Sequence, residues 1–209
     1  MPTTQQNIST SLRREKWRKD RAGYSQNFIT HLIHGSAGIG VTPLVTASMF
    51  PDRSLPIMFQ TRIRIQAGVS QGLIFEFGSS TRGAAAWVEP NMIGIVAGNG
   101  VVANERASAV WNLGAALPTD RIFQLTFAIV PGSGRVRLWD FGIRRADGVA
   151  VDNDFGPGDW ADAENGSFAE AVVGTVMADV PVASRIAPSN FEVIAPLLIF
   201  NNQMPRSFS

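Results

Sequence analysis

The side chains in this chain that could do chemistry are most concentrated in an acidic loop between residues 152 and 164. The loop reads DNDFGPGDWADAE, with carboxylates interspersed among glycines and small residues. Calcium takes roughly six to eight oxygen ligands in a flexible shell, so such a loop could bind it. A helix–loop–helix site does not fit, because Gly156 and Pro157 stand where ligands and turn residues are needed. The loop predicts either a calcium site or a solvated acidic loop. The calcium ligands would be Asp152, Asp154, Asp159 and Asp162.

The same loop carries Trp160, the tryptophan that we expect to be exposed. An indole offers a broad apolar face on which a sugar ring can stack. Trp160 with Asp159 or Asp162 is therefore a candidate carbohydrate site. The tryptophans expected in strands, where packing is the ordinary role, are Trp87, Trp111 and Trp139.

Catalytic patterns are missing from the sequence. A retaining glycosidase needs two carboxylates about 5–5.5 Å apart across the scissile bond. The chain has no Glu-x-Asp-x-Glu pattern, and Glu76, Glu89 and Glu105 are isolated. It also lacks a Gly-x-Ser-x-Gly elbow, a phosphate-binding Gly-x-x-x-x-Gly-Lys and any cysteine. We therefore expect a protein that is not an enzyme and that uses no cofactor, calcium apart.

A basic cluster lies near the amino terminus. Residues 1–21 carry six Lys or Arg side chains and two acidic ones, although the whole chain has a net charge of only +1. Such a segment can meet nucleic acid, a membrane or an acidic protein surface, or it can be a solvated arm. Because the cluster is small for tight phosphate binding, a nucleic-acid partner is not expected. We expect an arm that docks on a neighbouring subunit through Arg13, Arg14, Trp17, Arg18, Arg21 and Tyr24.

The elements that must position these residues are short strands. Charged and apolar residues alternate over residues 61–66, and residues 122–130 have an apolar side chain at every second position. We also predict that Leu73, Phe75 and Phe77 share one face of a strand. A period of two indicates a half-buried sheet. Glycines and polar turns recur roughly every ten residues, which leaves no room for helical crossovers, so the chain is predicted to be all-β and antiparallel.

Glycines and prolines predict the connections between these strands. Pro131–Gly134 separates two extended apolar segments, as in a hairpin. Asp147-Gly148 is a dipeptide favoured where both central turn residues need positive φ, so it predicts a second turn. Pro196, inside the apolar segment 191–200, predicts a bulge or an edge strand.

Length and composition suggest one folded domain with an extension. Of the 209 residues, 45% are hydrophobic and only 17% are charged, which suggests that part of the surface faces other protein. We predict an N-terminal arm and connector over residues 1–55 and a β-sandwich domain over residues 56–209. The polar start lacks the apolar core of a secretory signal, and no run approaches ~18 apolar residues. Synthesis in a cytoplasm without membrane insertion is the expectation.

The succession of strands resembles the concanavalin A-like, laminin G-like jelly roll. The resemblance covers roughly residues 57–203. It is carried by Gly72–Gly78, Gly83–Val88, Met92–Ala97, Phe123–Val130, Arg135–Asp140 and Leu197–Phe200. It is a pattern of strands and includes no signature motif. It implies a two-sheet antiparallel jelly-roll sandwich of a kind used for carbohydrate binding, for glycan hydrolysis or as a building module of virions and cell surfaces.

Three functions follow as hypotheses. The first is a non-enzymatic structural or attachment protein of a bacteriophage virion, such as a head decoration or a tail or baseplate component. Its partners would be copies of itself and other virion proteins, and it would be made in the host cytoplasm. The second is a carbohydrate-binding module that recognises surface glycans of a host. The third is a glycan hydrolase of the same fold, which the missing carboxylate pair disfavours.

Overall fold

The computed structural model describes residues 31–33, 44–45, 55–66, 71–78, 82–98, 106–151, 155, 166–168, 179–185 and 191–201. The strands are β1 (His31–Ile33), β2 (Leu44–Val45), β3 (Ile57–Ile65), β4 (Gly72–Gly78), β5 (Gly83–Glu89), β6 (Met92–Gly98), β7 (Arg106–Asn112), β8 (Ile122–Val130), β9 (Arg135–Asp140), β10 (Ile143–Val149), β11 (Gly166–Phe168) and β12 (Phe191–Asn201). Two 3-10 helices are η3 (Pro131–Ser133) and η4 (Val182–Arg185).

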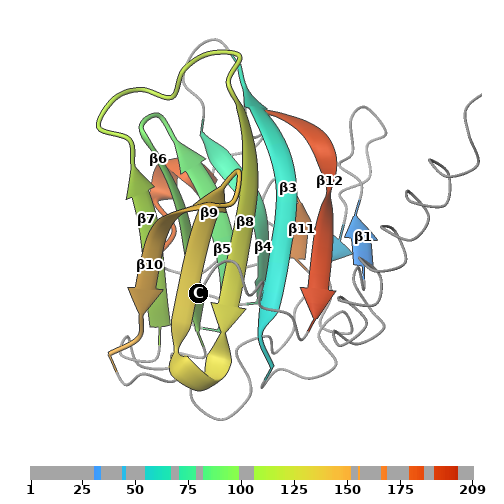
Figure 1. Cartoon of the computed structure of the whole chain (residues 1–209), viewed down its shortest axis with the longest axis vertical. Helices are drawn as coiled ribbons and strands as arrows, with labels where there is room; N and C mark the ends of the chain where they lie inside the picture. Colours follow the sequence, from blue (N-terminus) through green and yellow to red (C-terminus); the bar gives the residue numbers. More distant parts are fainter. Residues whose placement is uncertain are drawn as a thin grey trace, which may run out of the picture.

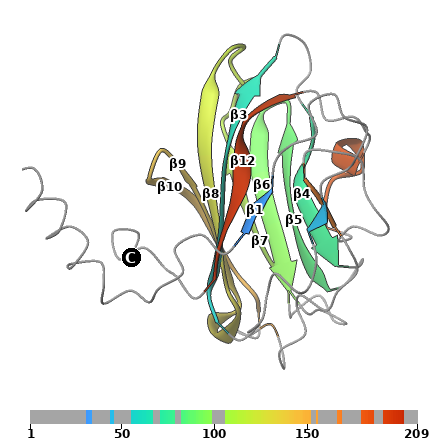
Figure 2. The same cartoon turned by 90° about the vertical axis from the view of Figure 1, so that its right-hand side faces the viewer.

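The strands form two antiparallel sheets packed face to face (Figures 1 and 2). Sheet A has the order β1-β12-β3-β8-β9-β10, and sheet B has the order β2-β11-β4-β5-β6-β7. The predicted all-β, two-sheet antiparallel sandwich is confirmed. Among the described residues, no helix has the length and apolar character needed to span a membrane.

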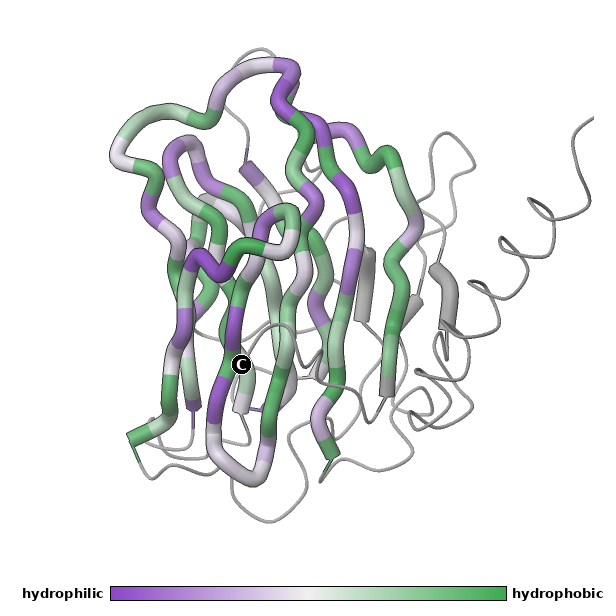
Figure 3. Tube along the Cα trace, in the orientation of Figure 1, coloured by the Kyte–Doolittle hydropathy of each residue, from purple (hydrophilic) through white to green (hydrophobic). Residues whose placement is uncertain are grey.

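Phenylalanines from both sheets build the centre of the core. Phe59 of β3 stacks on Phe75 of β4 with ring centroids 4.5 Å apart, and Phe127 of β8 meets Phe75 edge-on at 5.5 Å. Offset and edge-to-face pairs each add about 0.5–1.5 kcal/mol beyond the area that they bury. Figure 3 shows the corresponding alternation of hydrophilic and hydrophobic residues along β3. The alternation turns every second residue of β3 and β8 toward sheet B.

The prediction that Leu73 shares a face with Phe75 and Phe77 is wrong. The pairing of β4 with β5 shifts register between Leu73 and Phe75, which marks a β-bulge. One extra residue in a strand reverses the facing of the side chains beyond it. Ile74, Phe75 and Phe77 therefore belong to the main core, whereas Leu73 lies in a smaller cluster on the outer face of sheet B.

That outer cluster is organised around Trp87 of β5. The indole lies over Gly94 of β6, where an added Cβ would come within 2.3 Å of the ring. Only a glycine leaves room for the ring at this cross-strand position. On the same side of the sheet, the buried Ser184 of η4 donates a hydrogen bond to the carbonyl of Val88 at 3.1 Å. Trp87 is buried, as expected for a tryptophan in a strand.

One predicted hairpin turn is confirmed and the other is wrong. Residues 131–134 connect β8 and β9, with Gly134 in the left-handed region. Asp147 and Gly148 instead lie inside β10, paired with Arg137 and Val136 of β9. The turn between β9 and β10 is Phe141-Gly142, with φ of 47° and 78°.

Gly148 has a different physical reason for being glycine. A Cβ at this position would lie 2.0 Å from the carbonyl oxygen of Ser108 in β7. The last strands of the two sheets, β10 and β7, thus approach each other backbone to backbone. This contact closes one side of the sandwich and covers two strand edges that would otherwise be open to pairing.

Two strands come from the predicted N-terminal arm. β1 pairs with β12 over His31–Ile33, and β2 pairs with β11 through Leu44 and Val45. The backbone of these two segments therefore belongs to the sheets. The rest of residues 1–54 lies outside the described residues. The domain boundary at residue 55 stays a prediction.

We predict that Gly148→Ala destabilises the protein by about 1–3 kcal/mol, because the methyl group has to push the backbones of β7 and β10 apart. Gly132→Ala is the matched control, since nothing lies within 4 Å of a Cβ built there. The control should be neutral or slightly stabilising. Urea denaturation of both variants measures the difference, and equal midpoints would contradict the close approach.

Candidate functional site

Polar side chains form a ladder on the outer face of sheet A. They occupy alternate positions of β3 and of its neighbours β8 and β12, because the intervening residues are committed to the core. Three cross-strand contacts make the ladder: Arg64–Glu192 at 2.9 Å, Arg62–Gln124 at 3.0 Å and Gln60–Thr126 at 3.3 Å. The sheet thus presents a band of guanidinium, amide and hydroxyl groups on its outer face.

A small pocket opens beside this ladder, where β12 is irregular. The pairing of β12 with β3 shifts register between Val193 and Ala195 and again between Ala195 and Leu198. The hydroxyl of Thr61 donates a 2.9 Å hydrogen bond to the carbonyl of Ala195 within this stretch. The predicted bulge at Pro196 is thereby confirmed.

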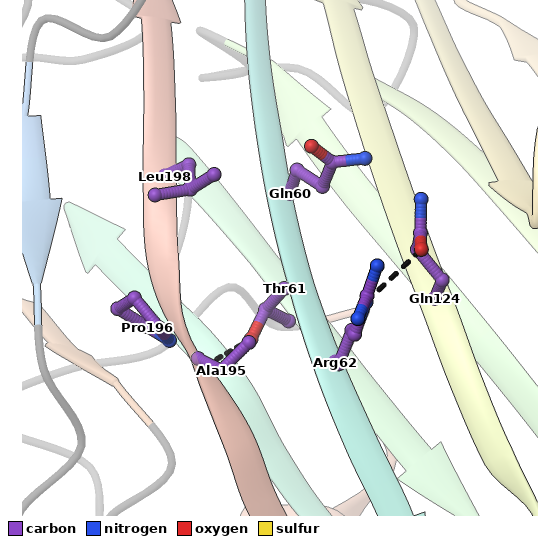
Figure 4. Close-up of a pocket in the computed structure, with 7 residues that line it drawn as sticks. All are labelled: Gln60, Thr61, Arg62, Gln124, Ala195, Pro196 and Leu198. Atoms are coloured by element: carbon purple, nitrogen blue, oxygen red, sulfur yellow. Dashed lines mark hydrogen bonds between the residues drawn. The ribbon is translucent and has the colours of Figure 1, made fainter. Parts of the chain in front are cut away.

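The pocket has a volume of about 160 Å³. It is lined by Gln60, Thr61, Arg62, Gln124, Ala195, Pro196 and Leu198 (Figure 4). This volume is below the roughly 300–1,000 Å³ of sites for drug-sized ligands, so the pocket suits one small ring or one branch of a larger ligand.

The chemistry of the lining favours binding. The two amides and the guanidinium can hydrogen-bond hydroxyl or carboxylate oxygens, and Pro196 and Leu198 offer apolar contact. The lining contains no carboxylate, histidine or serine, which are the usual general bases and nucleophiles. The lining hydroxyl, that of Thr61, donates its hydrogen bond to the carbonyl of Ala195, so the groups left to meet a ligand are the amides, the guanidinium and the apolar side chains.

On the strands beyond β8 in the same sheet, arginines of β9 and β10 gather around a single carboxylate. An oxygen of Asp147 lies 3.1 Å from Arg135, 3.3 Å from Arg137 and 3.6 Å from Arg144. One negative charge among three positive ones leaves this part of the face basic. Trp139 of β9, the register partner of Thr126, is buried between this cluster and the ladder.

A second cluster of cations and aromatic rings closes one end of the sandwich. The backbone pairing between β9 and β10 leaves out Arg145, which has no register partner. Its guanidinium lies 4.7 Å from the ring centre of Trp111. Arg121 lies 4.3 Å from the ring centre of Phe123. Both arginines reach the buried Asp140, at 3.8 Å from Arg145 and 3.1 Å from Arg121. Because the carboxylate of Asp140 and the aromatic rings already contact both guanidinium groups, we assign the cluster a structural role.

The site residues predicted from the sequence lie outside the described residues. This applies to the calcium set (Asp152, Asp154, Asp159, Asp162), to Trp160 and to the arm residues Arg13, Arg14, Trp17, Arg18, Arg21 and Tyr24. Within the described ranges, no three His, Cys, Asp or Glu side chains gather as metal ligands do. Calcium binding at the acidic loop and sugar binding at Trp160 stay predictions.

Two of the isolated glutamates occupy structural positions. Glu76 is fully buried in β4, where its register partners are Ala85 and Ser167. Glu89, at the end of β5, accepts a 3.4 Å hydrogen bond from Ser184. Both glutamates belong to sheet B, so neither reaches the pocket on the outer face of sheet A.

The sequence patterns did not predict that the lining residues form a pocket. The alternation over residues 61–66 does place Arg62 and Arg64 together on a polar face. Nothing local indicates that Gln124 and Leu198 come to lie beside them. The usable signal is Pro196, because a proline inside a strand predicts an irregularity where a pocket can open.

Comparisons with known proteins concern the fold. The botulinum neurotoxin serotype C1 binding domain aligns with a TM-score of 0.51 at 12% identity, covering 79% of this chain and 38% of the other. CBM40 of the Ruminococcus gnavus IT-sialidase aligns with a TM-score of 0.52 at 10% identity, covering 74% and 79%. The same domain bound to alpha2,3 sialyllactose aligns with a TM-score of 0.50 at 10% identity, covering 71% and 77%.

These similarities show the fold, which is a two-sheet β-sandwich. The chain spans 38% of the length of the neurotoxin domain, so the likeness extends to one part of that structure. No protein-family profile matches the sequence, and no curated protein sequence matches it. The identities of 10–12% carry the fold alone.

We predict that Asp140→Asn destabilises the protein more than Asp147→Asn. Asp140 is buried and balances two arginines whose side chains are 36% and 30% exposed, so losing its charge should cost about 1–3 kcal/mol. Asp147 is more exposed, and its ion pairs are worth about 0–1 kcal/mol. Thermal unfolding followed by circular dichroism measures the stability of both variants. Equal losses of stability would show that Asp140 does not stabilise the cluster of Arg121, Arg145 and Trp111.

Proposed function

We propose that this chain is a non-catalytic module that binds glycans through the outer face of sheet A. The observation that carries the proposal is the pocket of about 160 Å³ beside Gln60, Arg62 and Gln124. Sugars present hydroxyl oxygens around an apolar ring. Amide and guanidinium groups complement the hydroxyls, and Pro196 and Leu198 complement the ring.

The known proteins of similar fold support the same class of ligand. One of the domains of similar fold is bound to sialyllactose, and the neurotoxin structures are binding domains. The exposed indole predicted at Trp160, with Asp159 or Asp162, is a second candidate contact in this proposal. A module of this kind needs no catalytic carboxylates, in keeping with the absence of acidic side chains from the pocket lining.

We predict that Gln60→Ala combined with Gln124→Ala weakens glycan binding by about tenfold or more. Each neutral hydrogen bond contributes about 0.5–1.5 kcal/mol, and 1.4 kcal/mol is a factor of ten. A glycan array identifies ligands of the wild type, and titration calorimetry then compares the variants. We expect no glycosidic bond of any ligand to be cleaved during the titration.

Gln66→Ala is the matched control, because Gln66 directly follows β3 and does not line the pocket. Trp160→Ala separates the two candidate contacts. Binding lost in Trp160→Ala and kept in the double glutamine variant would move the site to the acidic loop. If no glycan on the array binds the wild type, the proposed function is wrong.

The second candidate is a structural or attachment subunit of a bacteriophage virion. It is supported by the origin of β1, which belongs to the first 55 residues and pairs with the long strand β12. A segment that adds a strand to a sheet can add it equally to a neighbouring copy, which is a common route to assembly. The arginines and aromatic residues predicted for the arm would then contact that neighbour.

We predict that deleting residues 1–34 leaves the sandwich folded and abolishes self-assembly. The deletion removes β1 and the basic cluster but keeps β12 paired with β3. Circular dichroism checks the fold, and analytical ultracentrifugation compares the mass of the full chain with that of the truncated one. A full chain that is monomeric, or an oligomer that survives the deletion, would remove the arm from assembly.

A further inference from the structure

The distinctive feature of the pocket is the bonding of its arginine, Arg62. Arg62 is exposed on the outer face of β3, and its Nε donates a 3.0 Å hydrogen bond to the side-chain oxygen of Gln124. In the part of the chain that the structure describes, no carboxylate lies within ion-pair distance of Arg62. The planar end of the side chain, with its two terminal nitrogens, therefore remains available beside the pocket.

The arginines of β9 and β10 on this face, and Arg64 of β3, each contact a carboxylate. Arg64, two residues further along β3, is paired with Glu192 at 2.9 Å. The arginines of β9 and β10 are paired with a shared aspartate: Arg135, Arg137 and Arg144 all contact Asp147. Arg62 is thus the described arginine of this face that lines the pocket and has no carboxylate partner.

The hydrogen bond to Gln124 also orients Arg62. A guanidinium held at Nε loses part of its side-chain freedom before a ligand arrives, and its two terminal nitrogens keep the fork geometry that matches a carboxylate. Figure 4 shows Arg62 and Gln124 joined by this bond between β3 and β8, with Gln60 beside them. Thr61, Pro196 and Leu198 lie on the other side of β3, toward β12. No lining residue carries a negative charge that would repel an anion.

We propose that the ligand of this pocket is an acidic sugar, whose carboxylate binds the terminal nitrogens of Arg62 while its hydroxyls bind Gln60 and Gln124. This proposal rests on the proposed glycan-binding function and names the class of sugar. Hydrogen bonds between ionised groups are about twice as strong as neutral ones. Because Arg62 is exposed, water and salt screen part of that gain, and the expected preference over a matched neutral sugar is roughly tenfold.

The test uses pairs of sugars that differ in the acid group. Methyl β-glucuronide is compared with methyl β-glucoside, and sialyllactose with lactose, by ligand-observed NMR and calorimetry on the full chain. We expect the acidic member of at least one pair to bind about tenfold more tightly, with a preference that shrinks as salt is raised. Sodium acetate at the same concentration should not compete, because it offers the carboxylate without the ring.

Two variants with the same change in net charge isolate Arg62. Arg62→Gln should abolish the preference for the acidic sugar. Arg64→Gln, on the same strand and face, should keep it because Arg64 is committed to Glu192. Equal loss in both variants would overturn the proposal, since it would show a general attraction to positive charge. Competition by acetate alone would also overturn it, because a simple anion site would suffice.

The failures of the two proposals can be told apart. Neutral glycans that bind the pocket as tightly as acidic ones would overturn the acidic-sugar proposal and leave glycan binding standing. Binding of acidic sugars that Arg62→Gln does not alter would place the acid elsewhere and overturn it in the same way. No binding by any glycan would overturn both.

Discussion

The packing of Phe59 against Phe75 and Phe127 between the two sheets constrains the rest of the molecule. These rings can meet only if β3 and β8 turn alternate residues toward sheet B. Burying one such ring contributes about 1.5–3 kcal/mol, so a slip of one residue in register would lose several such terms together. The remaining residues of β3 and β8 must then face outward. The polar ladder on the outer face of sheet A is thus a consequence of how the core is packed.

Irregularities in the strands turn this regular scaffold into a surface with distinct sites. The bulge in β4 sends Leu73 to the outer cluster under η4, and the skipped Arg145 in β10 reaches Trp111 at the end of the sandwich. The break in β12 around Pro196 opens the pocket beside Arg62. The extra residues, one each in β4 and β10 and two in β12, redirect side chains that strict alternation would have placed elsewhere.

The fold and the site carry different kinds of information about function. A two-sheet β-sandwich is shared by proteins with unrelated functions, so the fold alone does not decide the function. The pocket adds chemical detail, because its lining combines two amides, a guanidinium and apolar contacts, which suit the proposed glycan ligand. Assembly through the N-terminal segment is compatible with ligand binding in the pocket. The strand that this segment contributes, β1, lies on the opposite side of β12 from β3, the strand that carries Arg62.

The amino-acid sequence by itself determined the all-β class, most of the strands and the hairpin at Pro131–Gly134, because alternation and turn residues are local properties. It misplaced the turn near Gly148, whose glycine is required by contact with Ser108, forty residues away in the sequence. The pocket depends on the same kind of distant contact, since Thr61 bonds to Ala195 across 134 residues. Which outward side chains meet is decided by strand pairing and by bulges. Those are set by the packing energy of the whole sandwich, so only the tertiary structure could bring Arg62, Gln124 and Pro196 together.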